Sequence, residues 1–151
     1  MEAQNTEQGN IHVVVRVRGL NKKEIKEECK NPWEIDTNNN TITLVEEKSN
    51  EAKKAYAFDR VYGPEHTTND IYAASVFPVV QSVMQGFNGT VFAYGQTSSG
   101  KTYTMMGNPE QQCCGIIHRV LQDIFHYMRT VFKKLYNNIH IKIYICIFLK
   151  L

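Results

Sequence analysis

The sequence of 151 residues predicts an α/β domain with a central, mostly parallel β-sheet and helices packed against it. Three patterns support this fold class: β-branched residues at positions 11–17, apolar residues at helical spacing after residue 67, and a continuous apolar run at 90–94. Strands that alternate with helices pair in parallel, because each helix returns the chain to the same edge of the sheet. The composition, 42% hydrophobic and 21% charged, is that of a folded domain.

Small strands and one short helix are predicted for the first part of the chain. Residues 1–10 are polar and are expected to form a disordered leader. β-branched and aromatic residues, separated by turn-forming residues, then predict several short strands, of which the first is expected to be buried. These strands are expected at residues 11–17, 32–36, 41–45 and 56–58. The polar segment 21–30 is expected to form a short surface helix.

A longer helix is predicted where the apolar spacing changes. Thr67 and Asp70 form a capping pair, and the apolar residues that follow recur at helical intervals. The helix is expected to end near Gly86, since glycine commonly terminates helices. Pro78 lies inside it and lacks a backbone N–H, so we expect a kink there.

The pattern then returns to a strand and two more helices. The apolar run at 90–94 is typical of a strand buried on both faces. A new helix is expected to begin at Gly100 or Lys101. After Gly115, apolar residues at helical spacing continue to residue 128 and predict an amphipathic helix.

The end of the chain is basic and rich in isoleucine. Residues 115–151 carry six lysines and arginines and one acidic residue, which we interpret as a solvated helix face rather than a site for an acidic partner. Isoleucine alternates with other residues at 139–148, which predicts one more strand. AT-rich non-coding DNA yields the same composition when translated. Residues 131–151 are therefore interpreted as a divergent tail, either a strand or an artefact of the gene model.

Composition excludes several classes of protein. No stretch approaches 18 consecutive apolar residues, and the first 25 residues are polar with mixed charge, so neither a membrane span nor a secretory signal is predicted. The four cysteines contain no C-x-x-C spacing, which predicts reduced thiols rather than disulfides or a zinc ribbon. We expect an intracellular protein with neither a nucleic-acid nor a membrane partner.

Residues 95–102 match the phosphate-binding pattern G-x-x-x-x-G-K-[ST], between the apolar run and a helix start. The two glycines allow the backbone to bend around a polyphosphate, so that successive N–H groups point toward its oxygens. Lys101 is expected to contact the β- and γ-phosphates, and the Thr102 hydroxyl to bind Mg²⁺. The predicted nucleotide-binding residues of this loop are Gly95, Gln96, Thr97, Ser98, Ser99, Gly100, Lys101 and Thr102.

The residues around this loop resemble kinesin motor domains, most nearly the centromere-associated mitotic type. The similarity runs through residues 87–107, and it extends to 13–18, 58–62 and 115–117. It implies a P-loop NTPase with the kinesin-motor-like sheet, incomplete in this sequence. Residues 11–130 would be the N-terminal part of the motor domain.

The resemblance also implies an activity. The parent protein would bind ATP and Mg²⁺ and use ATP hydrolysis to move along microtubules, which are built of tubulin. It would lie in the cytoplasm on the cytoskeleton, with the spindle or kinetochore as a more specific option. By position, Arg16 and Tyr103 would flank the adenine base, Arg16 by stacking its guanidinium plane on the ring. Gly19 and His118 depart from the family pattern, which has proline at both positions, and Gly19 should loosen the adenine edge.

Two alternatives to a kinesin motor remain at this point: an inactive nucleotide-binding fragment and another P-loop NTPase. Kinesins hydrolyse ATP with a serine-rich switch and with a second switch that contains aspartate and glycine, whereas here no serine follows Ser99 and no glycine follows Gly115. No catalytic residue is therefore assigned. The chain would then be a catalytically inactive nucleotide-binding fragment that lacks both switches and most of the microtubule-binding surface. Another P-loop NTPase, such as a different cytoskeletal motor, is the third option.

Two metal patterns are disfavoured. Asp36, Asn38 and Asn40 begin a series that resembles a calcium loop, but Thr41 occupies the position that requires glycine. A hairpin turn is the preferred interpretation. A zinc site is also disfavoured, because its four candidate ligands have no common spacing. Those candidates are Cys113, Cys114, His118 and His126.

Overall fold

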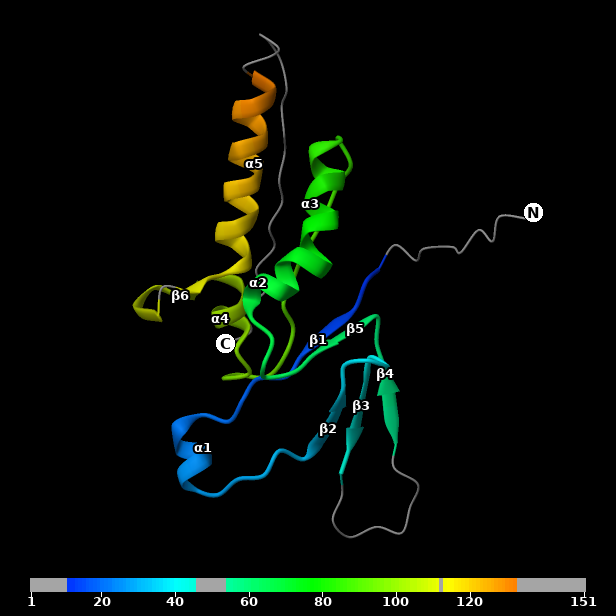
Figure 1. Ribbon diagram of the computed structural model, residues 1–151, viewed down its shortest axis with the longest axis vertical. Coiled ribbons are helices and arrows are strands. Elements are labelled where there is room, and N and C mark those ends of the chain that lie inside the picture. The colour runs from blue at the N-terminus through cyan, green and yellow to red at the C-terminus, as the bar shows by residue number, and fades with distance from the viewer. Residues whose placement is uncertain (1–10, 46–53, 112, 133–151) are drawn as a thin grey trace, which may run out of the picture. The chain divides into compact units, whose positions relative to one another are not determined.

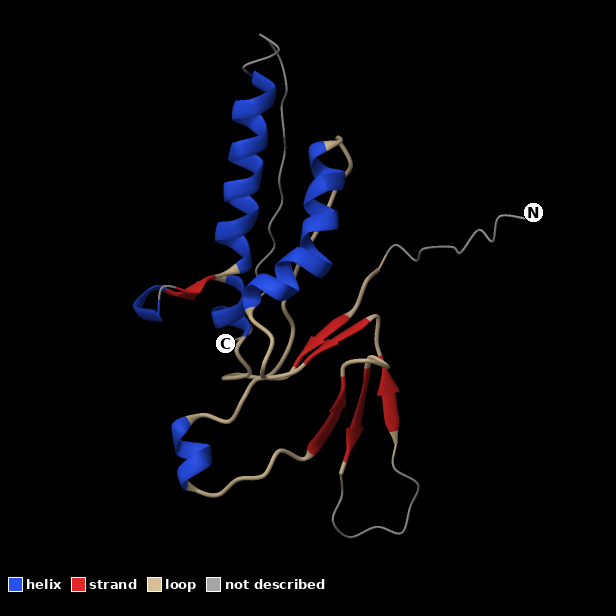
Figure 2. Ribbon diagram, in the orientation of Figure 1, coloured by secondary structure: helices blue, strands red, loops and turns tan. Residues whose placement is uncertain are grey.

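The computed structural model describes residues 11–45, 54–111 and 113–132, and the chain divides into two compact units, Met1–Glu65 and His66–Leu151. Figure 1 follows the chain through the elements of each unit, and Figure 2 shows that strands dominate the first unit and helices the second. The predicted leader at 1–10 and the predicted tail strand at 139–148 lie outside the described residues. The mixture of helices and strands, with a parallel strand pair, belongs to the predicted α/β class.

A parallel strand pair forms the centre of the first unit. β1 (Val14–Arg16) pairs with β5 (Arg60–Tyr62), with Val15 opposite Val61. The prediction of a buried strand over 11–17 is wrong in extent: the strand has three residues and is half-buried, and Ile11 is 79% exposed. In the described part of the chain β1 pairs with a single strand, β5. β5 was not predicted.

Three antiparallel strands form a second sheet in the first unit and confirm the predicted hairpin with its third strand. β2 (Trp33–Asp36) pairs with β3 (Thr41–Leu44), which pairs with β4 (Ala55–Ala57). Asp36 closes the turn, because its carboxylate accepts the backbone N–H groups of Asn38 and Asn39 at 3.0 Å each. These bonds hold the pKa of Asp36 below its usual value. The carboxylate therefore stabilises a hairpin turn.

The short helix α1 (Lys22–Lys26) begins with a capping box and confirms the surface helix expected in this segment. The Asn21 side chain accepts the N–H of Glu24 at 2.9 Å, and Glu24 accepts the N–H of Asn21 at 2.7 Å. Arg18 adds a bidentate contact to the same carboxylate, at 2.7 and 2.6 Å. The Arg18 hydrogen bond, followed by the Asn21 N–H, lowers the pKa of Glu24 to about 2.

A long, nearly continuous helical segment opens the second unit. α2 (Thr68–Ile71) leads through a π-helical turn, η1 (Tyr72–Val76), into α3 (Phe77–Met84), as the helical spacing predicts. In the π turn, which precedes Pro78, the N–H of Phe77 donates to the carbonyl of Tyr72, and the kink expected at Pro78 stays a prediction. Pro78 is then the second residue of α3, where a missing N–H costs little.

The predicted helix end at Gly86 is confirmed. Gly86 has φ +98°, a conformation that side chains rarely adopt, and the N–H of Phe87 donates to the carbonyl of Ser82 at 3.1 Å. These contacts satisfy carbonyls of the last helical turn. α3 therefore ends where the glycine reverses the chain.

The second half of this unit contains the two other predicted helices. α4 (Lys101–Met105) is followed by a small hairpin of β6 (Gly107–Asn108), the 3₁₀ turn η2 (Pro109–Gln111) and β7 (Cys113–Cys114). α5 (Ile116–Phe132) then confirms the amphipathic helix. An apolar core joins α3, α4 and α5 through buried side chains. These are Val80, Met105, Ile116, Val120 and Ile124.

The prediction of a buried strand at 90–94 is wrong for the described structure. No strand forms there, and Phe92 and Tyr94 are 63% and 92% exposed. A strand requires hydrogen-bonding neighbours, and none of the strands described pairs with this segment. Val91 alone turns toward the apolar core, between α3 and α5.

The Arg18 contact generates a testable prediction for α1. Because the pKa of Glu24 is lowered on folding, its contribution to helix stability is fully present above its ordinary value of 4.5 and is lost as the pH falls through about 2. Replacing Arg18 with alanine should move the carboxyl midpoint toward 4.5, as measured by NMR titration of the Glu24 side-chain carbon. Lys23→Ala is the control and should leave the midpoint in place. A midpoint that stays near 2 in Arg18→Ala would contradict this account.

Candidate functional site

The loop that precedes α4 has an unusual backbone. Gly95, Ser98 and Gly100 have φ angles of +151°, +65° and +97°. A Cβ on Gly95 would lie 2.7 Å from the Ser99 hydroxyl, so a side chain at this position would require that hydroxyl to move and would also have to adopt the φ that glycine adopts. Nothing lies within 4 Å of the corresponding position at Gly100, so there the requirement is conformational alone. The loop is therefore tightly folded, as the glycine spacing predicts.

Lys101 folds back over this loop. Its ammonium donates to the backbone carbonyls of Gly95 at 2.8 Å and of Gln96 at 2.7 Å. The side chain is half-buried, so a positive charge is held beside the loop backbone and not in open solvent. Two neutral carbonyls do not cancel this charge. An anion that reaches the loop would therefore meet a cation already in place.

Short backbone contacts fix the junction between the loop and α4. The N–H of Ser99 donates to the carbonyl of Gln96 at 3.2 Å, within the loop. Thr104 donates both its N–H, at 2.9 Å, and its hydroxyl, at 3.0 Å, to the carbonyl of Gly100. Thr102 is exposed on the first turn of α4, one residue after Lys101. The ammonium of Lys101 and the hydroxyl of Thr102 thus belong to consecutive residues at the start of this helix.

The two residues expected to flank a base lie in different units. Arg16 is half-buried in β1 of the first unit, whereas Tyr103 is 39% exposed on α4 of the second. Their juxtaposition around adenine therefore stays a prediction. Gly19, beside the same strand, has room for a side chain, since a Cβ there would lie 3.7 Å from the Cβ of Pro64.

Sequence reasoning missed two features of this unit. The first is the backbone of the loop: Ser98 is left-handed, and Lys101 donates to two carbonyls. Apart from the glycine spacing, no sequence pattern predicts either of these details. It also missed the bond from the Tyr72 hydroxyl to the Asp123 carboxylate, which joins η1 to α5 at 2.5 Å. These residues are 51 positions apart in sequence, and such pairs have no local pattern.

The chemical groups of the site residues are of the kinds that bind a nucleotide with Mg²⁺. A fixed ammonium and a folded glycine-containing backbone suit phosphate oxygens, and an exposed hydroxyl suits a hard cation. By contrast, no group of three or more histidine, cysteine, aspartate or glutamate side chains gathers within residues 11–45, 54–111 and 113–132. The helices in those ranges also include none long and apolar enough to cross a bilayer.

Comparison with known proteins identifies relatives of this sequence. The sequence model of the kinesin motor domain matches residues 16–148. Human centromere-associated protein E is 42% identical over 125 residues, which are 82% of this chain and 4% of that protein. The kinesin heavy chain of Strongylocentrotus purpuratus is 42% identical over 137 residues, 89% of this chain and 12% of that protein. Kinesin-like protein KIN-7D, mitochondrial, of Arabidopsis thaliana is 45% identical over 121 residues, 80% of this chain and 11% of that protein.

The loop geometry generates a stability prediction. Gly100→Ala should destabilise the second unit by about 1–2 kcal/mol, because alanine would be forced to the φ of +97° that glycine adopts. Thr97→Ala in the same loop is the matched control and should change the free energy of unfolding by less than about 0.5 kcal/mol. Urea unfolding of both variants measures the difference. Equal stability of the two variants would show that the loop relaxes without cost.

Proposed function

The chain belongs to the kinesin motor domain family, and from this membership we propose that residues 95–102 bind ATP with Mg²⁺ as part of a microtubule-dependent motor. Members of this family bind nucleotide with Mg²⁺ and bind microtubules. The chain spans between 4% and 12% of the length of the three relatives named above. Activity, partners and location of the parent protein are therefore inferred from the family.

The observation that carries the proposal is the position of the Lys101 ammonium. Its two carbonyl partners, on Gly95 and Gln96, are neutral, so exchanging them for phosphate oxygens gains a charge–charge attraction. Lys101 would then hold the β- and γ-phosphates, and the loop amides would surround them. Thr102 would bind the metal through its hydroxyl. Bound Mg²⁺ would itself neutralise part of the phosphate charge.

Two further residues complete the proposed nucleotide site. Arg16 would stack its guanidinium plane on the adenine, and the ring of Tyr103 would cover the other face. For the parent protein we propose a place on the cytoskeleton, in the cytoplasm. The name of the human relative, centromere-associated protein E, makes the spindle or kinetochore the more specific proposal.

A second candidate function is nucleotide binding without turnover. It is favoured by the residues after Thr102, among which there is no serine and the acidic residues are Glu110 and Asp123 alone. These residues do not supply the serine-rich switch or the aspartate and glycine of the second switch. The 151 residues would then bind ATP and release no phosphate.

Binding is tested by equilibrium dialysis of the full chain against MgATP. Lys101→Ala should weaken binding at least about tenfold, since it removes a charged contact to phosphate. Lys22→Ala, which removes an exposed lysine of α1, should leave binding unchanged. An equal affinity of wild type and Lys101→Ala would refute the proposed site.

Metal dependence and turnover separate the two candidates. Chelation of Mg²⁺ should weaken ATP binding by the wild-type chain, and Thr102→Ala should reduce that dependence, because the hydroxyl that binds the metal is gone. Phosphate release, measured with and without microtubules, then decides between them. Turnover that Lys101→Ala abolishes supports the motor. Tight binding without phosphate release supports the binding module.

A further inference from the structure

A groove of about 470 Å³ lies between α3 and α5 in the second unit. α3 turns one face to the apolar core through Val80, which is 3% exposed, and α5 does so through Ile124, which is 4% exposed. Other faces of the same two helices line the groove. The volume is within the range of small-molecule sites, which typically combine apolar walls with a few polar groups.

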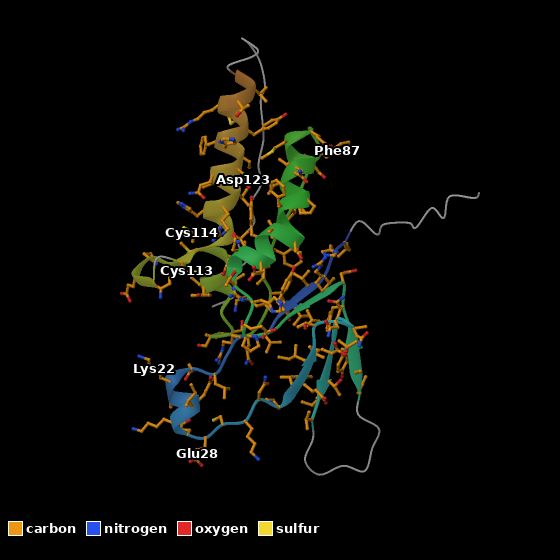
Figure 3. All side chains as sticks on the ribbon, in the orientation of Figure 1. Lys22, Glu28, Phe87, Cys113, Cys114 and Asp123 are labelled. Atoms are coloured by element: carbon orange, nitrogen blue, oxygen red, sulfur yellow. The ribbon has the colours of Figure 1, made fainter. Side chains whose placement is uncertain are left out.

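Asp123 places a carboxylate in this groove, and Figure 3 shows it on α5. The carboxylate is half-buried and accepts the Tyr72 hydroxyl at 2.5 Å. That donor is neutral, and burial together with the Asp123 carboxylate raises the pKa of Tyr72 far above its usual value. The negative charge of Asp123 is thus hydrogen-bonded but not neutralised by its partner.

No cation in the described ranges forms an ion pair with Asp123. Arg119, one turn earlier on α5, directs its guanidinium to the side-chain oxygen of Asn69 at 2.8 Å. His126 is the other titratable side chain of the groove and is exposed. Asp123 is therefore the acidic side chain among the residues that line the groove, and the charge of Arg119 acts on the Tyr72 hydroxyl that donates to it.

Aromatic and amide side chains, with Met84 and Thr130, form the remaining walls. Phe77 and Tyr127 are half-buried on opposite helices. Met84, the last residue of α3, also lines the groove. Aromatic faces attract cations, and they also bury the apolar body of a ligand. Gln81, on α3, and Gln85, which follows its last residue, are exposed and offer hydrogen bonds at the rim.

We propose that the groove between α3 and α5 binds a small organic cation with an aromatic body, whose ammonium pairs with Asp123 and whose ring lies against Phe77 and Tyr127. This occupant matches the charge and the aromatic walls together. A neutral molecule would leave the half-buried charge unpaired, and an anion would be repelled by it. The proposal does not depend on nucleotide binding, because none of the lining residues belongs to the phosphate loop.

The test titrates the full chain with 2-phenylethylamine, and separately with the neutral 2-phenylethanol, at about pH 8, where an ordinary alkylamine is protonated. Ligand-observed NMR measures both affinities. The amine should bind at least about tenfold more tightly than the alcohol. Equal affinities, or tighter binding of the alcohol, would overturn the proposal.

Two variants in the groove, Asp123→Asn and Tyr127→Leu, and one control outside it, Glu110→Gln, test whether the amine binds at this site. Asp123→Asn keeps an acceptor for the Tyr72 hydroxyl and should remove the preference for the amine, whereas Glu110→Gln, which removes an exposed carboxylate elsewhere in the same unit, should preserve it. Tyr127→Leu retains an apolar wall and should weaken the amine several-fold more than the alcohol. Tyr127→Leu keeps the test decisive if Asp123→Asn does not fold. A preference that survives both Asp123→Asn and Tyr127→Leu would contradict the assignment.

Discussion

The ammonium of Lys101, held between the carbonyls of Gly95 and Gln96, is the contact on which the functional account depends. The loop can present both carbonyls to it because Gly95 and Gly100 adopt φ angles that other residues rarely adopt. Because the carbonyl partners are neutral, the loop retains its positive charge.

Apolar packing holds both ends of this loop in place. Val91, before the loop, and Met105, at the end of α4, line one small apolar cavity of about 40 Å³ with residues of α3 and α5. Met105 is 3% exposed, so α4 is anchored at the end opposite Lys101. Gly115 lies so close to the backbone of Met106 that a side chain could not fit, which fixes the start of α5 beside the end of α4. The position of the phosphate loop is thus set by the hydrophobic core, and its charge by one side chain.

Local patterns predicted the helices well and the strand at 90–94 badly. Thr67 and Gly86 mark the ends of one helical segment through capping chemistry that acts within a few residues, so the sequence alone locates them. Residues 90–94 have the composition of a buried strand, but a strand exists only with hydrogen-bonding neighbours, which no local pattern supplies. The loop was likewise located by its glycine spacing. Its lysine contacts and the Tyr72–Asp123 bond depend on how distant segments meet.

The most direct test of the central claim is a titration of the isotopically labelled full chain with MgATP, followed by the backbone amide resonances of residues 95–102. The account predicts that these resonances shift and saturate in the wild type, because the loop amides and the Lys101 ammonium exchange their present partners for phosphate oxygens. It also predicts that Lys101→Ala removes the shifts at the same nucleotide concentration. Resonances in the loop that do not respond in the wild type, or that respond equally in Lys101→Ala, would contradict the account.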